Sequence, residues 1–190
     1  MEKLELYEAL LQKWQKAINL VGPLTITETA ERHFYDSAQM LRYIPDVNIK
    51  LVDMGSGAGF PGMVLAILGV KEVHLIESDV RKATFLREVS RETKTPIILH
   101  DKRAEDCKIE GVDVFTARAM APLKDLLDYM AQLTTKSACY GLFLKGGQYE
   151  DEIAKARKKW EFVTDIQQSE TDVTGKIIRV SRLMPKACGT

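Results

Sequence analysis

The sequence is poor in cysteine and carries no excess of charge of either sign. Its 190 residues include only three cysteines, which lack metal-ligand spacing and cannot all pair with one another: Cys107, Cys139 and Cys188. We therefore expect a reducing compartment, inert thiols and no metal centre. Because 27 basic residues balance 27 acidic ones, any attraction to nucleic acid must come from where the charges lie rather than from their sum.

Long apolar runs are also missing. No stretch approaches the length of a membrane span, and residues 1–5 begin an amphipathic segment without the hydrophobic region of a signal peptide. We expect a cytoplasmic protein with no membrane partner. A chain of this length, with 45% hydrophobic residues, is enough for one well-packed domain, and we expect it to act as a monomer.

What the sequence does have is a glycine-rich stretch between an apolar strand and an apolar helix. Residues 49–54 have the composition of a short buried strand, and four glycines follow: Gly55, Gly57, Gly59 and Gly62. Glycine lets the backbone turn tightly and approach a ligand where a side chain would collide. Pro61 suits the first turn of the next helix. This strand, turn and helix together predict a cofactor site.

The spacing fits two classes of cofactor. Counted from Gly57, the glycines match G-x-G-x-x-G, a dinucleotide-binding pattern that is weak on its own. Counted from Asp53, they match D-x-G-x-G-x-G, the first motif of methyltransferases that use S-adenosylmethionine (AdoMet). Glu77 ends the next predicted strand, where an acid can accept hydrogen bonds from ribose hydroxyls in either class. A nicotinamide-dependent oxidoreductase and an AdoMet-dependent enzyme both stay open at this point.

Strands and helices alternate from residue 49 onward, which is the pattern of a parallel sheet covered on both faces. We predict strands near 49–54, 72–77, 96–99, 112–117 and 138–145, and helices near 61–69, 79–93, 122–134 and 148–159. Runs at 162–167 and 176–183 should form an antiparallel hairpin at one edge. Dehydrogenases normally add another parallel strand there. The hairpin therefore favours an α/β, Rossmann-like class I AdoMet-dependent methyltransferase fold with a mostly parallel seven-stranded sheet.

The beginning of the chain predicts an N-terminal helical extension of the same domain. Apolar residues at spacings of three and four form a stripe along a helix from about Lys3 to Asn19, which Gly22-Pro23 breaks. A second helix is expected from Thr27, whose neighbourhood suits an amino-terminal cap, to Arg42. We assign residues 1–45 to this extension and residues 46–190 to the methyltransferase domain.

Short motifs spread over most of the chain resemble one family. The most specific is Gly55-Ser-Gly-Ala-Gly-Phe-Pro-Gly62. The others are Lys13-Trp-Gln-Lys-Ala-Ile-Asn-Leu20, Arg32-His33, Asp36-Ser37, Arg81-Lys82, Phe85-Leu86, Arg103-Ala-Glu105, Arg118-Ala119 and Leu144-Lys-Gly146. With these motifs the chain resembles the bacterial small-subunit ribosomal RNA methyltransferase G family, also called glucose-inhibited division protein B.

The resemblance implies AdoMet as the cofactor and methylation of nitrogen 7 of one guanine in 16S rRNA, guanine 527 of the 530 loop near the decoding site. The partner that it implies is 16S rRNA or the small ribosomal subunit. Two alternatives are kept. One is a non-catalytic AdoMet-binding ribosome assembly factor, and the other, with less support, is the nicotinamide-dependent oxidoreductase.

Carried over position by position, the resemblance implies cofactor contacts at Gly55, Phe60, Ala104, Glu105 and Arg118. The strand-end acid, the glycine spacing and the expected ribose contact add Asp53, Gly57 and Glu77. The backbone at Ala104 and the side chain of Glu105 would read the adenine edge. Arg118 would meet the methionine carboxylate or a substrate phosphate.

Nitrogen 7 of guanine already has an in-plane lone pair, so we expect catalysis by positioning without a general base. The candidates for substrate positioning are His33, Arg118 and Lys145, and we hypothesise that Phe60 stacks on the guanine. The candidates for RNA contact lie on the predicted helix 79–93 and are Arg81, Lys82, Arg87 and Arg91. The basic group at residues 155–159 receives no function.

Overall fold

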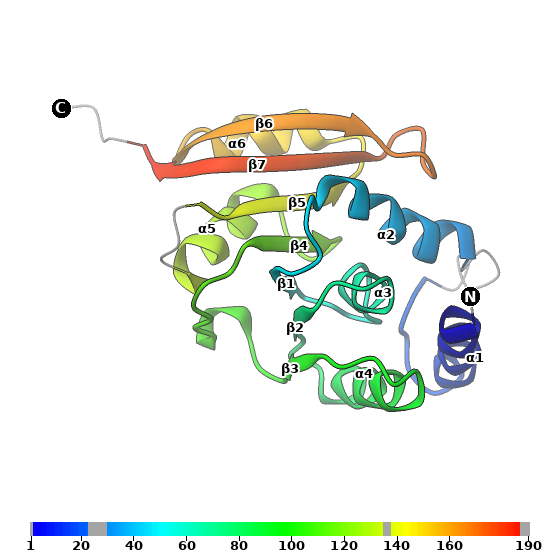
Figure 1. The fold of residues 1–190 in the computed structure, drawn as a ribbon. Helices are drawn as coiled ribbons and strands as arrows, with labels where there is room; N and C mark the ends of the chain where they lie inside the picture. The colour runs from blue at the N-terminus through cyan, green and yellow to red at the C-terminus, as the bar shows by residue number, and fades with distance from the viewer. Residues whose placement is uncertain (1, 23–29, 135–137, 187–190) are drawn as a thin grey trace.

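The computed structural model describes residues 2–22, 30–134 and 138–186 and arranges them around one seven-stranded sheet of order β3-β2-β1-β4-β5-β7-β6 (Figure 1). Five strands are parallel: β1 (Lys50–Met54), β2 (Glu72–Ile76), β3 (Ile98–His100), β4 (Val114–Arg118) and β5 (Tyr140–Lys145). The strand order reverses between β1 and β4. Open parallel sheets bind their ligands at the carboxyl ends of strands at such a reversal, so this edge is where a site is expected.

The last two strands form the predicted antiparallel hairpin, which is confirmed. β6 (Trp160–Gln168) lies at the sheet edge, and β7 (Lys176–Pro185) pairs antiparallel with both β5 and β6. The strand begins at Trp160 rather than at Phe162. Its indole is buried and donates a hydrogen bond of 2.6 Å from Nε1 to Asp128 on α5 (Leu123–Leu133), which connects the start of β6 to that helix.

Helices cover both faces of the sheet, because alternate strand residues face two separate cores. Leu51 and Val114 point to the face covered by α1 (Glu2–Gln15), α3 (Gly62–Ile67) and α4 (Val80–Glu92). Val52 and Phe115 point to the face covered by α5 (Leu123–Leu133) and α6 (Tyr149–Ala156). Burial on both faces explains why these strands read as continuous apolar runs. Within the described ranges, no helix is long and apolar enough to cross a membrane.

Helix α1 packs against α3 and α4 and ends earlier than predicted, at Gln15 rather than near Asn19. The Gln15 side chain is the reason. Its Oε1 accepts hydrogen bonds of 2.9 and 3.1 Å from the backbone N–H groups of Leu20 and Val21, and its Nε2 donates to the Val21 carbonyl. The chain therefore folds back in a turn around this amide instead of continuing the helix.

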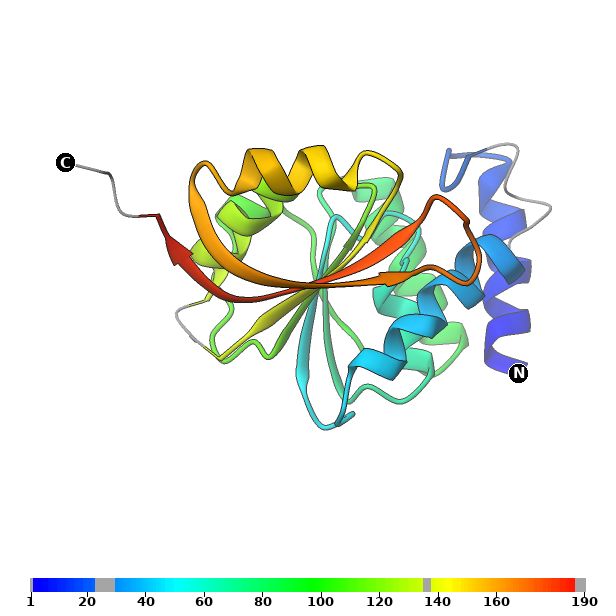
Figure 2. The same cartoon turned by 90° about the horizontal axis from the view of Figure 1, so that it is seen from above.

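The second predicted helix is confirmed from Ala30 onward, whereas its expected cap at Thr27 lies outside the described residues. It consists of a π-helical segment η2 (Ala30–Tyr35), one turn α2 (Asp36–Ala38) and a 3-10 segment η3 (Gln39–Tyr43). The view from above shows this helix beside the turn between β6 and β7 (Figure 2). Segments far apart in the sequence therefore meet at the carboxyl edge of the sheet. The remaining short element is the 3-10 turn η4 (Ala104–Asp106) after β3.

Candidate active site

The glycine turn after β1 forms one wall of a cavity of about 570 Å³. Gly55 and Gly57 line it with φ angles of 64° and 59°, a backbone conformation that L side chains adopt only at a cost. The turn is held by a hydrogen bond of 2.9 Å from the Ser56 N–H to the Ile76 carbonyl. The remaining lining comes from residues 20–22, His33, Phe60, Glu77, Lys82 and residues 118–120. The site predicted from the glycine pattern is thus a real concavity.

Glu77 lies at the end of β2 and connects the turn to the next helix. Its Oε2 accepts a hydrogen bond of 2.8 Å from the Gly57 N–H, and its Oε1 accepts one of 2.7 Å from the Asp79 N–H. A carboxylate oxygen has two lone pairs, so each oxygen can accept a further bond from the cavity. This is the geometry that the predicted ribose contact requires.

Asp53 supports the turn from below instead of lining the cavity. Its carboxylate is fully buried, accepts a bond of 2.7 Å from the Thr116 hydroxyl and lies 3.3 Å from the Gly62 N–H. Burial raises its pKa to about 6, and the hydrogen bonds from Thr116, Ser56 and Gly62 oppose that rise. The carboxylate points at the start of α3, and its predicted contact with the cofactor stays a prediction.

Phe60 is packed among side chains of its own chain. The ring is 3% exposed and stacks on Tyr7, with centroids 5.5 Å apart, and on His33, with centroids 5.0 Å apart. The Arg118 guanidinium lies over the same ring at 4.7 Å. Phe60 therefore packs within its own chain at the edge of the first cavity, and its stacking on a guanine stays a prediction. The Tyr7 hydroxyl donates to the Ala58 carbonyl, so α1 braces the glycine turn through this cluster.

Arg118 ends β4 and brings two of the other predicted residues together. Its Nη1 donates to Nδ1 of His33 over 3.0 Å and lies 3.8 Å from Oδ2 of Asp36. Burial lowers the pKa of the guanidinium, and the Asp36 carboxylate acts in the opposite direction. Because an arginine can only donate, Nδ1 of His33 must be the acceptor. In this hydrogen bond the lone pair of Nδ1 is directed at the guanidinium.

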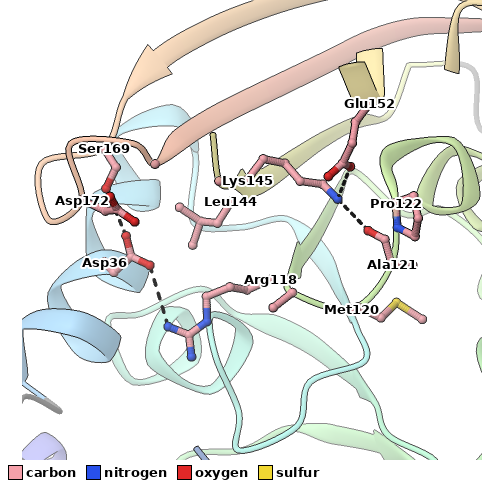
Figure 3. Close-up of a pocket in the computed structure, with 13 residues that line it drawn as sticks. Asp36, Arg118, Met120, Ala121, Pro122, Leu144, Lys145, Glu152, Ser169 and Asp172 are labelled. Atoms are coloured by element: carbon pink, nitrogen blue, oxygen red, sulfur yellow. Dashed lines mark hydrogen bonds and ion pairs between the residues drawn. The ribbon is translucent and has the colours of Figure 1, made fainter. Parts of the chain in front are cut away.

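A second cavity, of about 450 Å³, lies on the other side of Arg118 (Figure 3). Arg118, Ala119 and Met120 line both cavities and form a wall that they share. Ala119 has a φ of 51°, which costs a residue with a side chain roughly 1–2 kcal/mol. Strain of this kind tends to occur at functional sites. The rest of the second cavity comes from Asp36, residues 121–122, residues 144–146, Glu152 and the turn between β6 and β7.

Two predicted adenine contacts lie outside the first cavity. Ala104 is buried among the apolar residues under α5, and Glu105 is exposed on η4. Neither is among the described residues that line the cavity. They follow β3, at the same edge of the sheet as Glu77, so an elongated ligand that starts at the glycine turn would have to extend past β2 to meet them.

The four basic residues proposed for RNA contact lie on or near the exposed face of α4. Lys82 reaches the first cavity, and Arg81 stands at the first turn of the helix. Arg87 is 2.6 Å from Asp101, and Arg91 is 2.8 Å from Glu92. Both pairs are solvent-exposed and therefore weak, so a phosphate group can compete for these arginines.

Asp36, Met120 and Glu152 are among the lining residues of the two cavities to which the sequence assigns no role. Asp36 appeared only within a family motif, although its Oδ1 accepts from Gln39, Ser169 and Thr171 at the hairpin turn. Met120 and Glu152 were not singled out at all. Met120 could have been found as a residue just past the end of a central strand, where ligands bind. No signal in the sequence marks Glu152 among the charges of its helix.

The sheet order, the glycine turn with an acid at the end of the next strand, and the cavity above them define a class I AdoMet-dependent methyltransferase. Solved structures agree on the fold: a TehB-like methyltransferase of Corynebacterium glutamicum has a TM-score of 0.61 and 12% identity, covering 94% of this chain and 99% of that one.

The profile of the family described as rRNA small subunit methyltransferase G matches residues 1–180. A ribosomal RNA small subunit methyltransferase G of Rhodospirillum rubrum is 48% identical over 96% of this chain and 90% of its own length. The one from Rhodospirillum centenum is 49% identical over 98% and 86%. The chain belongs to this family and is an AdoMet-dependent rRNA methyltransferase. The recognised family and the predicted cofactor are confirmed.

Proposed function

We propose that this protein transfers the methyl group of AdoMet to nitrogen 7 of a guanine in 16S rRNA. The observation that carries the proposal is the wall formed by Arg118, Ala119 and Met120, which separates two adjacent cavities. One cavity has the groups that suit the cofactor, and the other is open to a second reactant. Methyl transfer needs two reactants held in line at close range, and two cavities with a common wall provide that arrangement.

In the first cavity, Glu77 would hold the ribose hydroxyls, and the backbone at Gly55 and Gly57 would approach the ligand closely. Arg118 would face the methionine carboxylate. Beyond this cavity, past the end of β2, Ala104 with Glu105 would meet the adenine. Support for this placement comes from the hydrogen bonds of Glu77 and from the buried position of the Arg118 guanidinium. We keep Asp53 as the residue that fixes the turn.

The reaction itself asks for alignment more than for proton transfer. The lone pair of nitrogen 7 forms the new bond to the methyl carbon while the carbon–sulfur bond breaks with its electron pair going to sulfur, so guanine gains one positive charge and no proton leaves. The residues of this chain therefore act by excluding water and fixing geometry. His33 suits this role, because its Nδ1 is bonded to Arg118 and is not directed at a reacting atom.

The substrate is 16S rRNA, either free or in the small ribosomal subunit, and we propose that the protein meets it as a monomer in the cytoplasm. Arg81 and Lys82 stand near the first cavity and can contact phosphates there. Arg87 and Arg91 lie further along the same helix. Together they make a basic track on a protein whose total charge is balanced.

The test is methyl transfer from radiolabelled AdoMet to small subunits, and to naked 16S rRNA, from a strain that lacks the modification. Borohydride and aniline cleavage, which is specific for 7-methylguanosine, followed by primer extension maps the product. The expected result is label at nitrogen 7 of one guanine in at least one of the two substrates. Tight binding of cofactor and subunits without any transfer would instead support an assembly factor.

A further inference from the structure

The second cavity holds a hydrogen-bond donor and an acceptor side by side (Figure 3). The Lys145 side chain, at the end of β5, is only 7% exposed, and its Nζ lies 2.7 Å from Oε2 of Glu152 on α6. Nζ also donates to the Ala121 carbonyl over 2.6 Å, and Oε2 accepts from the Leu123 N–H over 2.7 Å. These bonds from three segments fix both side chains in one orientation.

The pair has hydrogen-bonding capacity beyond these contacts. An ammonium group has three N–H donors, and a carboxylate has two oxygens with two lone pairs each. In the part of the chain that the structure describes, two N–H groups of Lys145 have acceptors and the bonds to Glu152 all go to Oε2. The pair therefore offers a ligand in the cavity one N–H donor beside a carboxylate acceptor.

Guanine presents the complementary pattern on its Watson–Crick edge, where the acceptor O6 is next to the donor N1–H. Adenine presents the reverse, an amino donor beside the acceptor N1. We propose that Lys145 and Glu152 select the target base as guanine, with Lys145 donating to O6 and Glu152 accepting from N1–H. This inference rests on the proposed function and names the residues that choose its substrate base.

The other walls of the cavity suit a base held in this way. Met120, Pro122 and Leu144 supply apolar surface for the flat faces of the ring, as is usual in pockets where a few polar groups set the orientation. Nitrogen 7 lies on the Hoogsteen edge of guanine, on the other side of O6 from N1. A base held by its Watson–Crick edge at Lys145 and Glu152 leaves nitrogen 7 free to meet the methyl group.

The charge of the pair also suits the reaction. A lone buried ammonium would repel a base that gains a positive charge during methylation. Glu152 neutralises Lys145 at 2.7 Å, so the pair donates to O6 without adding net charge to the cavity. A purely structural ion pair between β5 and α6 would hold the two elements together but would not distinguish one base from another.

The experiment compares three RNA substrates whose target base is guanine, inosine or 2-aminopurine. All three keep nitrogen 7. Inosine retains O6 and N1–H, and 2-aminopurine has neither. For the wild-type protein, kcat/KM on inosine should stay within about threefold of guanine, whereas 2-aminopurine should lose about 10–100-fold. A loss on inosine with little loss on 2-aminopurine would overturn the inference, because 2-aminopurine keeps the 2-amino group and the selective contact would then be to that group.

Glu152→Gln is the matching variant, since its amide oxygen can still accept from the Leu123 N–H. It should reduce the ratio of kcat/KM on guanine to kcat/KM on 2-aminopurine by about tenfold. It should leave the calorimetric affinity for S-adenosylhomocysteine unchanged. Asp151→Asn, on the exposed side of the same helix, should alter neither quantity. If Glu152→Gln keeps the wild-type ratio of kcat/KM on guanine to kcat/KM on 2-aminopurine, and still methylates guanine at nitrogen 7, this inference alone is overturned. A wild-type protein that never methylates nitrogen 7 would overturn the proposed function as well.

Discussion

Gly55 and Gly111 have similar left-handed backbones, with φ angles of 64° and 72°, but only Gly55 lines the first cavity. An added Cβ at Gly55 would overlap the Met120 side chain, whereas at Gly111 the nearest atom is 4.0 Å away. Gly55→Ala and Gly111→Ala should both lose about 1–2 kcal/mol of stability from backbone strain. Only Gly55→Ala should also weaken S-adenosylhomocysteine binding, by at least about tenfold, because it displaces the shared wall.

Thermal unfolding and calorimetric titration of both variants test this. If Gly55→Ala binds S-adenosylhomocysteine as tightly as the Gly111→Ala control does, the ligand does not approach the glycine turn.

Asp53 gives a pH dependence of stability with a defined sign. Its folded-state pKa is about 6, against an ordinary value of 3.8, so the folded protein holds this proton more tightly than the unfolded chain. This tighter proton binding stabilises the folded state fully below about pH 4, and the stabilisation is lost as the pH rises through 6. The free energy of unfolding should change by up to about 3 kcal/mol as a result. Asp53→Asn cannot titrate and should lack this component.

Urea unfolding of both proteins between pH 4 and 7 measures it. The wild-type free energy of unfolding, minus that of the variant, should decrease across this window. Taking the difference cancels the exposed carboxylates, several of which have lowered pKa values and opposite slopes. A constant difference would show that Asp53 is ionised throughout.

Among the elements, α1 has a direct connection to the site through the Tyr7 hydroxyl, which donates to the Ala58 carbonyl in the glycine turn. Tyr7→Phe keeps the ring but leaves that carbonyl unpaired, and should cost about 1–2 kcal/mol of stability. It should also weaken cofactor binding severalfold, because Ala58 lines the first cavity.

Tyr140→Phe is the matched control. The Tyr140 hydroxyl donates over 3.0 Å to the Tyr43 carbonyl, away from both cavities, so this variant should lose stability without losing affinity. Equal affinities of the two variants in calorimetry would reduce α1 to an ordinary packing helix.

Helix α4 is where RNA contact is expected. Changing both Arg87 and Arg91 to glutamine should weaken RNA binding. The slope of log affinity against log salt concentration should become shallower by the equivalent of up to about two phosphate contacts. The same double change at Lys155 and Lys158, exposed in and just after α6, serves as the control for lost charge. Filter binding at several salt concentrations compares them, and identical slopes in both double variants would mean that α4 is only a solvated surface.

Elements were predictable where their signals are local. Each parallel strand has a run of apolar residues, and glycine or proline lies next to several of these strands. The succession of strands along the chain and the hairpin could therefore be predicted directly. The end of α1 could not be predicted, because glutamine is not a helix-breaking residue and the contacts of the Gln15 amide appear only in the folded chain. Contacts between side chains of different elements were hidden in the same way. Nothing near Lys145 in the sequence indicates that Glu152 and the carbonyl of Ala121 meet its ammonium.

At the scale of the whole molecule, the sheet has two edges, and both are poorly suited to pairing with another copy. β3 has three residues, and β6 carries Glu161 and Asp165 exposed along its length. Short or charged edge strands oppose association between sheets. Light scattering over a range of micromolar concentrations should therefore give a mass near 21.4 kDa. A mass that doubles with concentration would contradict the proposed monomer.

The hairpin turn has a consequence for the biosynthesis of the protein. The described lining of the first cavity is complete at Met120, whereas the second cavity also needs Ser169, Asp172 and Gly175. Translation adds residues in order from the amino end, so the groups of the first cavity exist well before the second cavity has its last wall. On the proposed function, a chain whose synthesis stops before Ser169 has the cofactor cavity but lacks part of the substrate cavity. The ribosome must therefore nearly finish this protein before both cavities exist together.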